Sequence, residues 1–343
     1  MGLLEYSAIT TKIRAMSSSL FTEEDYHHLS SLESIPEFVD YLRRSRGYND
    51  TYSNLDTEDL HRGYLEKLLT KDRYDDFARI YRFANVRQRR YMDLYFMRIE
   101  VSFIKTCHRM LFDGQKINFN LEEFGSFFDK HSDVNLHALS SVSSLGELHE
   151  ALRGSKYYEP LKKLQDFPAP TLFDYETRLD LFYFTTLWKN RTKCLKGRDL
   201  EIITEVYGTR IDMVNMQWIY RTKKYHDLSP AQIYSFIIPF TYKLKSSELS
   251  ALVEAGSVEE FISVYKTTFY KDYDFNEQVS LENIHQHIQL RLARASTRKY
   301  PYSIASINSY LYNKEIEVRR LVRALECIRY KLNPAESYKI IMR

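Results

Sequence analysis

The chain has 343 residues, of which 44% are apolar and 28% are charged, and its formal net charge is +3. It contains only 10 glycines and 8 prolines, less than half of the roughly 40 that average usage gives for this length. The apolar fraction is sufficient for a packed core and argues against global disorder. The shortage of turn-forming residues argues against propellers, sandwiches and barrels, which turn about every ten residues.

The N-terminal segment predicts the first helix, because Tyr6, Ile9, Ile13 and Met16 follow one another at spacings of three and four residues. This segment lacks the basic start and continuous apolar stretch of a secretory signal. No run of about 18 apolar residues, the length that spans a bilayer, occurs in the chain. The three cysteines are isolated from one another, which fits a reducing compartment. We therefore expect a soluble, mostly helical protein.

A five-residue pattern, Ser-apolar-x-Glu-apolar, occurs three times and begins at Ser34, Ser144 and Ser257. The pattern is typical of a helix start, in which the serine caps the third N–H and the glutamate reaches back to the N–H of the cap. A tyrosine follows each copy. These tyrosines are Tyr48, the pair Tyr157 and Tyr158, and Tyr270.

The similarity extends on both sides of each serine. Upstream, an amphipathic helix leads to a second helix start, and these starts are 22–25, 120–123 and 229–232. Downstream lie longer helices, which we predict over 58–82, 173–190, 280–295 and 314–332. On the last of these, Glu315 and Arg319 form an i,i+4 pair on the exposed side.

These patterns predict an all-α fold of three similar helical repeats of about 110 residues each. The predicted boundaries are 1–95, 96–205 and 206–343. No low-complexity linker separates the repeats, so we expect them to pack as one compact body.

The chain shows no constellation typical of catalysis or of cofactor binding. The glycines form none of the phosphate-binding or nucleophile motifs, and the histidines lack zinc-site spacing. Asp72, Asp75 and Asp76 could bind Mg²⁺ on a helix, but their basic neighbours favour a solvated, salt-bridged face. We predict no catalytic, cofactor or metal site. An all-α enzyme that uses these carboxylates is a further hypothesis, and it ranks below the other two functions considered for this chain.

Two clusters of arginines are the candidate partner-binding residues. The first lies in the segment 79–91, where arginines alternate with Tyr81, Phe83 and Tyr91. Such a set could follow phosphates and stack on bases. The acidic neighbours and the nearly neutral chain instead favour a helix face that pairs with those neighbours or with a protein partner. The second cluster lies on the last predicted helix. The candidates are Arg82, Arg87, Arg89, Arg90, Arg319 and Arg323.

Three stretches together carry a resemblance to a known family. The N-terminal residues 6–38 resemble the C subunit of the V/A-type ATPases, whose family includes the d subunit of the vacuolar ATPase. The segment from Asp212-x-x-Asn215 to Leu228-Ser229 is similar to a recurrent signature of that family, and 311–329 to its closing helix. In the middle copy, Phe96 follows Asp93 where the signature has Asn, and Lys105 stands near the expected Arg.

The resemblance implies a pseudo-threefold, funnel-like arrangement of the repeats on the cytoplasmic face of the membrane c-ring (K-ring in some bacteria). It implies a non-catalytic rotor subunit that receives the D and F subunits of the central stalk and contacts the membrane only through the ring. No cofactor and no nucleic acid is implied. Whether H⁺ or Na⁺ is transported, and in which direction, stays open. The alternative is a stand-alone helical adaptor that binds nucleic acid or protein through the basic 79–91 face.

Overall fold

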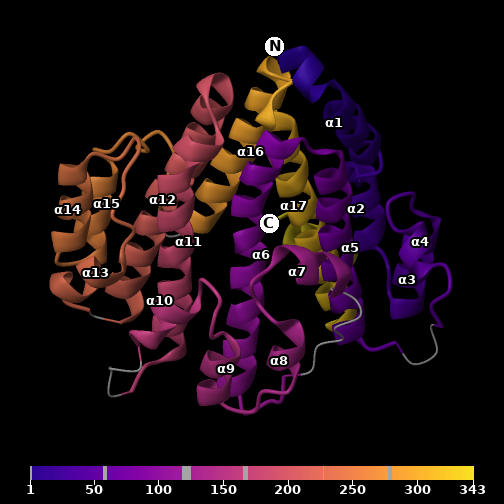
Figure 1. Ribbon diagram of the computed structural model, residues 1–343, viewed down its shortest axis with the longest axis horizontal. Helices are drawn as coiled ribbons and strands as arrows, with labels where there is room; N and C mark the ends of the chain where they lie inside the picture. The colour runs from indigo at the N-terminus through magenta and orange to yellow at the C-terminus, as the bar shows by residue number, and fades with distance from the viewer. Residues whose placement is uncertain (1, 57–59, 118–124, 165–168, 227, 277–279) are drawn as a thin grey trace. The chain divides into compact units, whose positions relative to one another are not determined.

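The computed structural model describes residues 2–56, 60–117, 125–164, 169–226, 228–276 and 280–343. Every regular element in these ranges is an α-helix, so the predicted fold class is confirmed. The helices gather into two compact units, one of Met1–Asn85 with Ala293–Arg343 and the other of Val86–Leu292 (Figure 1). The repeat boundaries and the threefold arrangement stay predictions.

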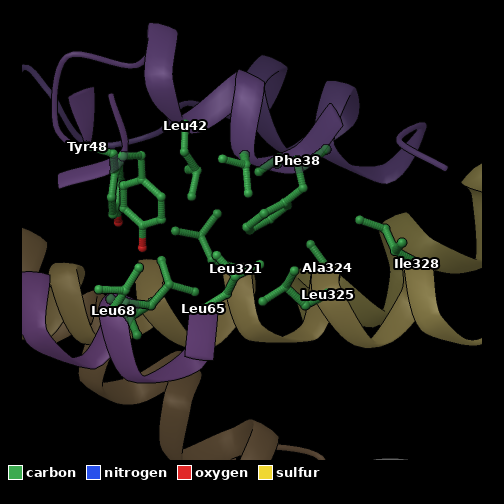
Figure 2. Packing of buried hydrophobic residues seen from close by; sticks show 14 of the residues in the cluster. Phe38, Leu42, Tyr48, Leu65, Leu68, Leu321, Ala324, Leu325 and Ile328 are labelled. Atoms are coloured by element: carbon green, nitrogen blue, oxygen red, sulfur yellow. The ribbon is translucent and has the colours of Figure 1, made fainter. Parts of the chain in front are cut away.

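The first unit joins the two ends of the chain. Phe38 and Leu42 point toward Leu321 and Leu325, and all four side chains are buried in one apolar cluster (Figure 2). The N-terminal helices therefore share a core with the C-terminal ones. The helices of this unit are α1 (Gly2–Ser17), α2 (Glu23–Ser30), α3 (Ile35–Arg44), α4 (Asn49–Tyr52), α5 (Arg62–Phe83), the end of α16 (Leu281–Lys299), α17 (Ile304–Arg329) and α18 (Pro334–Met342).

The second unit is built on two long helices. One of them, α6 (Val86–Phe112), packs against α11 (Leu172–Cys194). The other, α12 (Gly197–Tyr225), packs against α14 (Ser246–Glu254) and α15 (Val258–Tyr265) around a core that includes Met216, Phe261 and Tyr265. Gly208 lets Tyr242 approach the second long helix, because a Cβ at this glycine would lie 2.5 Å from Cγ of Tyr242. The helices are α6 (Val86–Phe112), α7 (Gly125–His131), α8 (Leu136–Ser140), α9 (Leu145–Ala151), α10 (Tyr158–Lys162), α11 (Leu172–Cys194), α12 (Gly197–Tyr225), α13 (Pro230–Phe236), α14 (Ser246–Glu254), α15 (Val258–Tyr265) and most of α16.

The three predicted serine caps form, at the starts of α3, α9 and α15. Ser34, Ser144 and Ser257 accept the N–H of the glutamate three residues later, at 3.4, 3.2 and 3.1 Å. The predicted return bond is displaced by one residue, because each glutamate carboxylate accepts the N–H of the residue before the serine. These bonds are Glu33 to Glu37 (2.9 Å), Ser143 to Glu147 (2.8 Å) and Gly256 to Glu260 (2.6 Å).

Backbone rotation at the cap accounts for this displacement. The three serines are extended, with φ between −139° and −145°. Thr22 and Ser229, at two of the other predicted helix starts, have φ of −88° and −64° and form the reciprocal box. Rotation about the N–Cα bond of the serine turns its own N–H away from the glutamate carboxylate. The N–H of the preceding residue then lies within hydrogen-bond distance of that carboxylate. The predicted helix start at 120–123 lies outside the described residues.

The predicted long helices correspond to α5, α11, α16 and α17. The last one begins ten residues earlier than predicted, at Ile304. The predicted exposed pair on this helix is wrong for Glu315, whose side chain is buried on the face that meets the core, while Arg319 is exposed.

Candidate functional site

The arginines predicted between 82 and 90 divide between the two units. Arg82 is exposed at the end of α5 in the first unit, and Arg89 and Arg90 are exposed near the start of α6 in the second. Arg87 is engaged within the second unit, since its Nη2 lies 3.1 Å from Oδ2 of the buried Asp199 on α12. The structure therefore gives Arg87 a structural contact that the sequence did not suggest.

The second predicted pair belongs to a larger cluster on α17 and the C-terminus. Burial and the neighbouring guanidinium groups of Arg319, Arg320 and Arg343 lower the pKa of Arg323. No described carboxylate forms an ion pair with any of these four arginines, and Arg320 lies over the ring of Tyr26 instead. This C-terminal arginine cluster (Arg319, Arg320, Arg323 and Arg343) is a concentration of positive charge, and the charge of Glu326, which also pairs with Arg62, offsets part of it.

A buried carboxylate on α17 binds the N-terminal part of the first unit. Oε1 of Glu317 accepts the hydroxyl of Tyr48 at 2.6 Å and lies 3.1 Å from Nζ of Lys314. Its Oε2 accepts the backbone N–H of Phe21 at 2.6 Å. Lys314 is only 3% exposed, also pairs with Asp76, and lies 4.0 Å from the ring centre of Tyr48. The network holds α17 against the segments on both sides of the α2–α3 pair.

A second carboxylate, on α6, has the same kind of surroundings. Glu100 is fully buried, and its Oε2 accepts the hydroxyl of Tyr157 at 2.6 Å and lies 2.7 Å from Nζ of Lys156. Its Oε1 accepts the hydroxyl of Ser132 at 2.5 Å, just before α8 begins. Glu100 therefore holds α6 against the segments on both sides of the α8–α9 pair.

The third carboxylate, on α12, accepts four hydrogen bonds. Oδ1 of Asp212 accepts the N–H of Tyr242 at 2.9 Å, and Oδ2 accepts those of Lys243 and Leu244 at 2.7 and 3.0 Å. The hydroxyl of Tyr270 donates to Oδ2 at 2.8 Å. Burial raises the pKa of Asp212, and these four donors oppose that effect. Asp212 holds α12 against the segments on both sides of the α14–α15 pair.

These three tyrosine–carboxylate pairs are Tyr48–Glu317, Tyr157–Glu100 and Tyr270–Asp212. Each tyrosine follows its capping serine by 13 or 14 residues, and each carboxylate lies on a helix of 26 to 29 residues. Burial next to a carboxylate raises the pKa of each tyrosine, so the hydroxyls remain protonated donors. The pairs are satisfied, structural interactions rather than a pair of groups poised for acid–base chemistry.

The predicted solvated, salt-bridged face of α5 is wrong for two of its three aspartates. Asp75 does form a half-buried pair with Lys71 at 2.6 Å, but Asp72 and Asp76 are buried. Asp76 accepts the hydroxyl of Tyr310 at 2.7 Å and pairs with Lys314 and Arg79. The prediction missed this burial because α17, which packs against α5, comes from the other end of the chain. In the described ranges, no group of three or more His, Cys, Asp or Glu side chains could hold a metal ion.

Asp72 makes the stability of the first unit depend on pH. Burial raises its pKa to about 6, although Thr51 donates to it at 2.7 Å. Since the folded state holds this proton more tightly than the unfolded state, the free energy of unfolding should fall as the pH rises from about 4 to 6. Asp72→Asn keeps the oxygen that accepts from Thr51 and removes the buried charge. At pH 8 we expect this variant to be more stable than the parent chain by up to about 3 kcal/mol.

Urea unfolding of both chains between pH 5 and pH 8 measures this difference. Asp75→Asn is the matched control on the same helix, because Asp75 is half-buried and already paired with Lys71. A gain for Asp72→Asn that does not grow with pH would contradict this account.

A pair of buried histidines in the second unit also has a structural role. Nδ1 of His108 lies 2.9 Å from the carbonyl oxygen of Ile104, and its ring stacks on Tyr175 with centres 4.7 Å apart. Burial lowers the pKa of His108 to about 4 and also lowers that of His149. Both rings are therefore neutral at pH 7 and pack as part of the core.

The comparison with known families decides the classification. Residues 9–339 match the ATP synthase (C/AC39) subunit family. The chain belongs to the ATP synthase C/AC39 subunit family. The resemblance stated from the sequence is thereby confirmed.

Several curated relatives are similar to this C/AC39 family member along nearly the whole chain. It is 24% identical over 327 residues to the C subunit of the A-type ATP synthase of Methanococcoides burtonii, covering 92% of this chain and 88% of that protein. The identity is 22% for the protein of the same name from Methanocaldococcus jannaschii, covering 100% and 87%, and 25% for that from Methanosarcina acetivorans, covering 93% and 88%. In the described part of this family member, no helix has the length and apolarity needed to cross a bilayer.

The residues of the recurrent signature in this C/AC39 chain have structural roles. Asn215 accepts the N–H of Ile238 at 2.8 Å and donates to its carbonyl oxygen at 2.9 Å, next to the bonds of Asp212. Nζ of Lys223 donates to the carbonyl oxygens of Val253, at 2.7 Å, and Ala255 at the end of α14. The signature thus fixes α12 to the backbone of the helix pair beside it.

In the middle of the chain, Glu100 has surroundings similar to those of Asp212, whereas the sequence pattern pointed to Asp93. The pattern Asp-x-x-Asn favoured Asp93 because that residue is an aspartate, although Phe96 stands at the position of the asparagine. All three carboxylates precede a buried apolar residue by four positions, and these residues are Ile104, Met216 and Leu321. Asp93 precedes the buried Met97 in the same way, so this spacing does not separate Glu100 from Asp93.

Proposed function

We propose that this chain is a non-catalytic central-rotor subunit of a V/A-type rotary ATPase. In this role it couples the D and F subunits of the central stalk to the membrane c-ring, so that ATP hydrolysis or synthesis is linked to H⁺ or Na⁺ transport. The observation that carries the proposal is the family match over residues 9–339. The chain would lie on the cytoplasmic side, at the inner face of the membrane, and would contact it only through the ring.

The buried polar groups support a mechanical role. The tyrosine–carboxylate pairs, the Asn215 contacts and the Lys223 contacts all use polar side chains to fix long helices to shorter ones. Satisfied buried networks of this kind hold one packing arrangement, and a close-packed interior transmits strain. A subunit that passes torque from the stalk to the ring needs both properties.

We also propose that the chain consists of three repeats in a pseudo-threefold, funnel-like arrangement. The three tyrosine–carboxylate pairs support this, since each joins one long helix to one capped helix pair. In the first repeat the long helix is α17, so the C-terminal helices would complete the N-terminal repeat. Each repeat would then present the same elements to the stalk and the ring.

The partner-facing residues would be Arg82, Arg89 and Arg90, together with Arg319 and Arg323 of the C-terminal arginine cluster. These side chains are exposed or half-buried, and guanidinium groups on a rim favour acidic partners and speed their association. Arg87, which is bonded to Asp199, would instead support the start of α6.

Purification of the affinity-tagged chain from its own cells tests the proposal. We expect the D and F subunits of the stalk and the protein of the c-ring to copurify with it in detergent. The double charge reversal Arg319→Glu with Arg323→Glu should reduce their recovery. Arg153→Glu, at an exposed position paired with Glu150, is the control and should not. Recovery of the parent chain without any other ATPase component, or with nucleic acid instead, would contradict the proposal.

A further inference from the structure

We propose that the first unit contains a binding pocket for a phosphate-bearing anion, formed by α1, the end of α16 and the start of α17. The pocket has a volume of about 590 Å³. Arg14 of α1 and Arg294 and Arg298 of α16 line it, together with Ser309 and Asn313 of α17. Nothing in the proposed rotor role requires such a site, so the proposal goes beyond that role.

This pocket, the arginine pocket, is lined by positively charged side chains without any negatively charged one. Its lining contains three arginines and no carboxylate, and none of these arginines forms an ion pair with a described residue. The hydroxyl of the lining residue Tyr310 donates to Asp76, whose charge is already balanced by Lys314 and Arg79. A bound anion would therefore relieve repulsion among the arginines without competing with an internal partner.

Helix dipoles account for the positions of two of the three arginines. Arg14 and Arg298 lie in the last turns of α1 and α16, where a cation is favourable beside the helix dipole. Arg294 lies one turn earlier on α16, outside that effect. In addition, Pro301 and Ser306 place the positive end of α17 at the same pocket. Four sources of positive potential thus meet around one cavity.

The donors of the arginine pocket suit phosphate. A guanidinium group binds two phosphate oxygens at once through its planar fork of N–H groups. The side chains of Ser17, Ser309 and Asn313 also line the pocket, and they make no hydrogen bond with the rest of the described chain. The volume lies within the range of small-molecule sites, about 300–1,000 Å³. The shared chemistry is that of a pyrophosphate, a nucleoside diphosphate or a lipid phosphate headgroup.

A second cavity of about 540 Å³, in the other unit, shows the contrast. It is lined by Lys243, Lys245, Lys271 and Arg291, but also by Glu248 and Asp272. Its two carboxylates offset half of its four cations and compete with an anion for them, so we expect it to bind a polyvalent anion more weakly than the arginine pocket does. It supplies a matched control, because Arg291 lies on α16 only three residues before Arg294 and is exposed as well.

Isothermal titration of the purified full-length chain with sodium pyrophosphate in low-salt buffer tests the proposal. We expect saturable binding of one pyrophosphate, which weakens as salt is added. In the double variant Arg294→Ala with Arg298→Ala the affinity should fall by about tenfold or more, since two charged contacts are lost. Arg291→Ala should change it by less than about twofold. These arginines are exposed, so the variants should stay folded, and circular dichroism checks this.

Absence of pyrophosphate binding at millimolar concentration, or an equal loss in Arg291→Ala and in the double variant, would overturn the proposal. Two further arms identify the source of the phosphate. Tighter binding of ADP than of pyrophosphate would indicate a nucleotide. Sedimentation with phosphatidic acid vesicles that is lost in the double variant would indicate a lipid headgroup. These tests do not depend on the rotor role, because they use the isolated chain.

Discussion

Replacing Asp212 with alanine is expected to lower the free energy of unfolding of the second unit by about 3–5 kcal/mol. The substitution leaves three backbone N–H groups and the hydroxyl of Tyr270 without an acceptor inside the protein. Each buried donor without a partner costs about 1–3 kcal/mol, and water entering the vacated space offsets part of the sum. Urea unfolding followed by circular dichroism measures the loss.

Two variants separate the hydrogen bonds of Asp212 from more general effects. Tyr270→Phe removes only the hydroxyl and should cost about 1 kcal/mol. Glu201→Ala removes an exposed carboxylate on the same helix, paired with Arg198, and should change the stability by less than about 0.5 kcal/mol. If Asp212→Ala costs no more than Glu201→Ala, the carboxylate does not hold α12 as described.

Replacing Glu317 with alanine is expected to destabilise the first unit by about 3–5 kcal/mol. The substitution leaves the charge of Lys314 buried with only Asp76, at 3.6 Å, and removes the acceptor for Tyr48 and Phe21. Breaking one side of a buried ion pair is costly, because the remaining charge loses its nearer partner. The same urea experiment measures the change.

A double variant tests the electrostatic reason for this loss. Lys314→Met in the Glu317→Ala background removes the buried charge that lost its nearer partner and leaves Asp76 paired with Arg79, so we expect it to restore part of the stability. Glu326→Ala, on the exposed part of α17 and paired with Arg62, is the control and should cost less than about 1 kcal/mol. A double variant that is less stable than Glu317→Ala alone would show that packing, and not charge, dominates at this position.

Local features of the fold could be predicted from the sequence, because they depend on residues close together in the chain. The capping serines and the long helices are of this kind, since caps and apolar periodicity act within a few residues. The displaced bond of Glu37 could not be predicted, because it depends on the φ angle of Ser34. The early start of α17 was missed because the residues after Ser303 include several buried polar side chains.

The buried carboxylates depend on contacts between distant parts of the chain. Glu317 lies 269 residues from Tyr48 and Glu100 lies 57 residues from Tyr157. A glutamate on a helix is ordinarily solvated, so its burial becomes evident only when the helix that covers it is known. The contact of Arg87 with Asp199, 112 residues away in the sequence, could not be predicted for the same reason, and the role of Arg87 in partner binding stays a prediction.

The measurement that most directly tests the central claim is ATP-driven ion transport in membrane vesicles from a strain that lacks this chain. We expect these cells to retain ATPase activity in a soluble complex, while ATP no longer drives ion uptake into the vesicles. Supplying the parent chain should restore uptake. Vesicles that pump ions at the normal rate without this chain would contradict the proposed role as the coupling between stalk and ring.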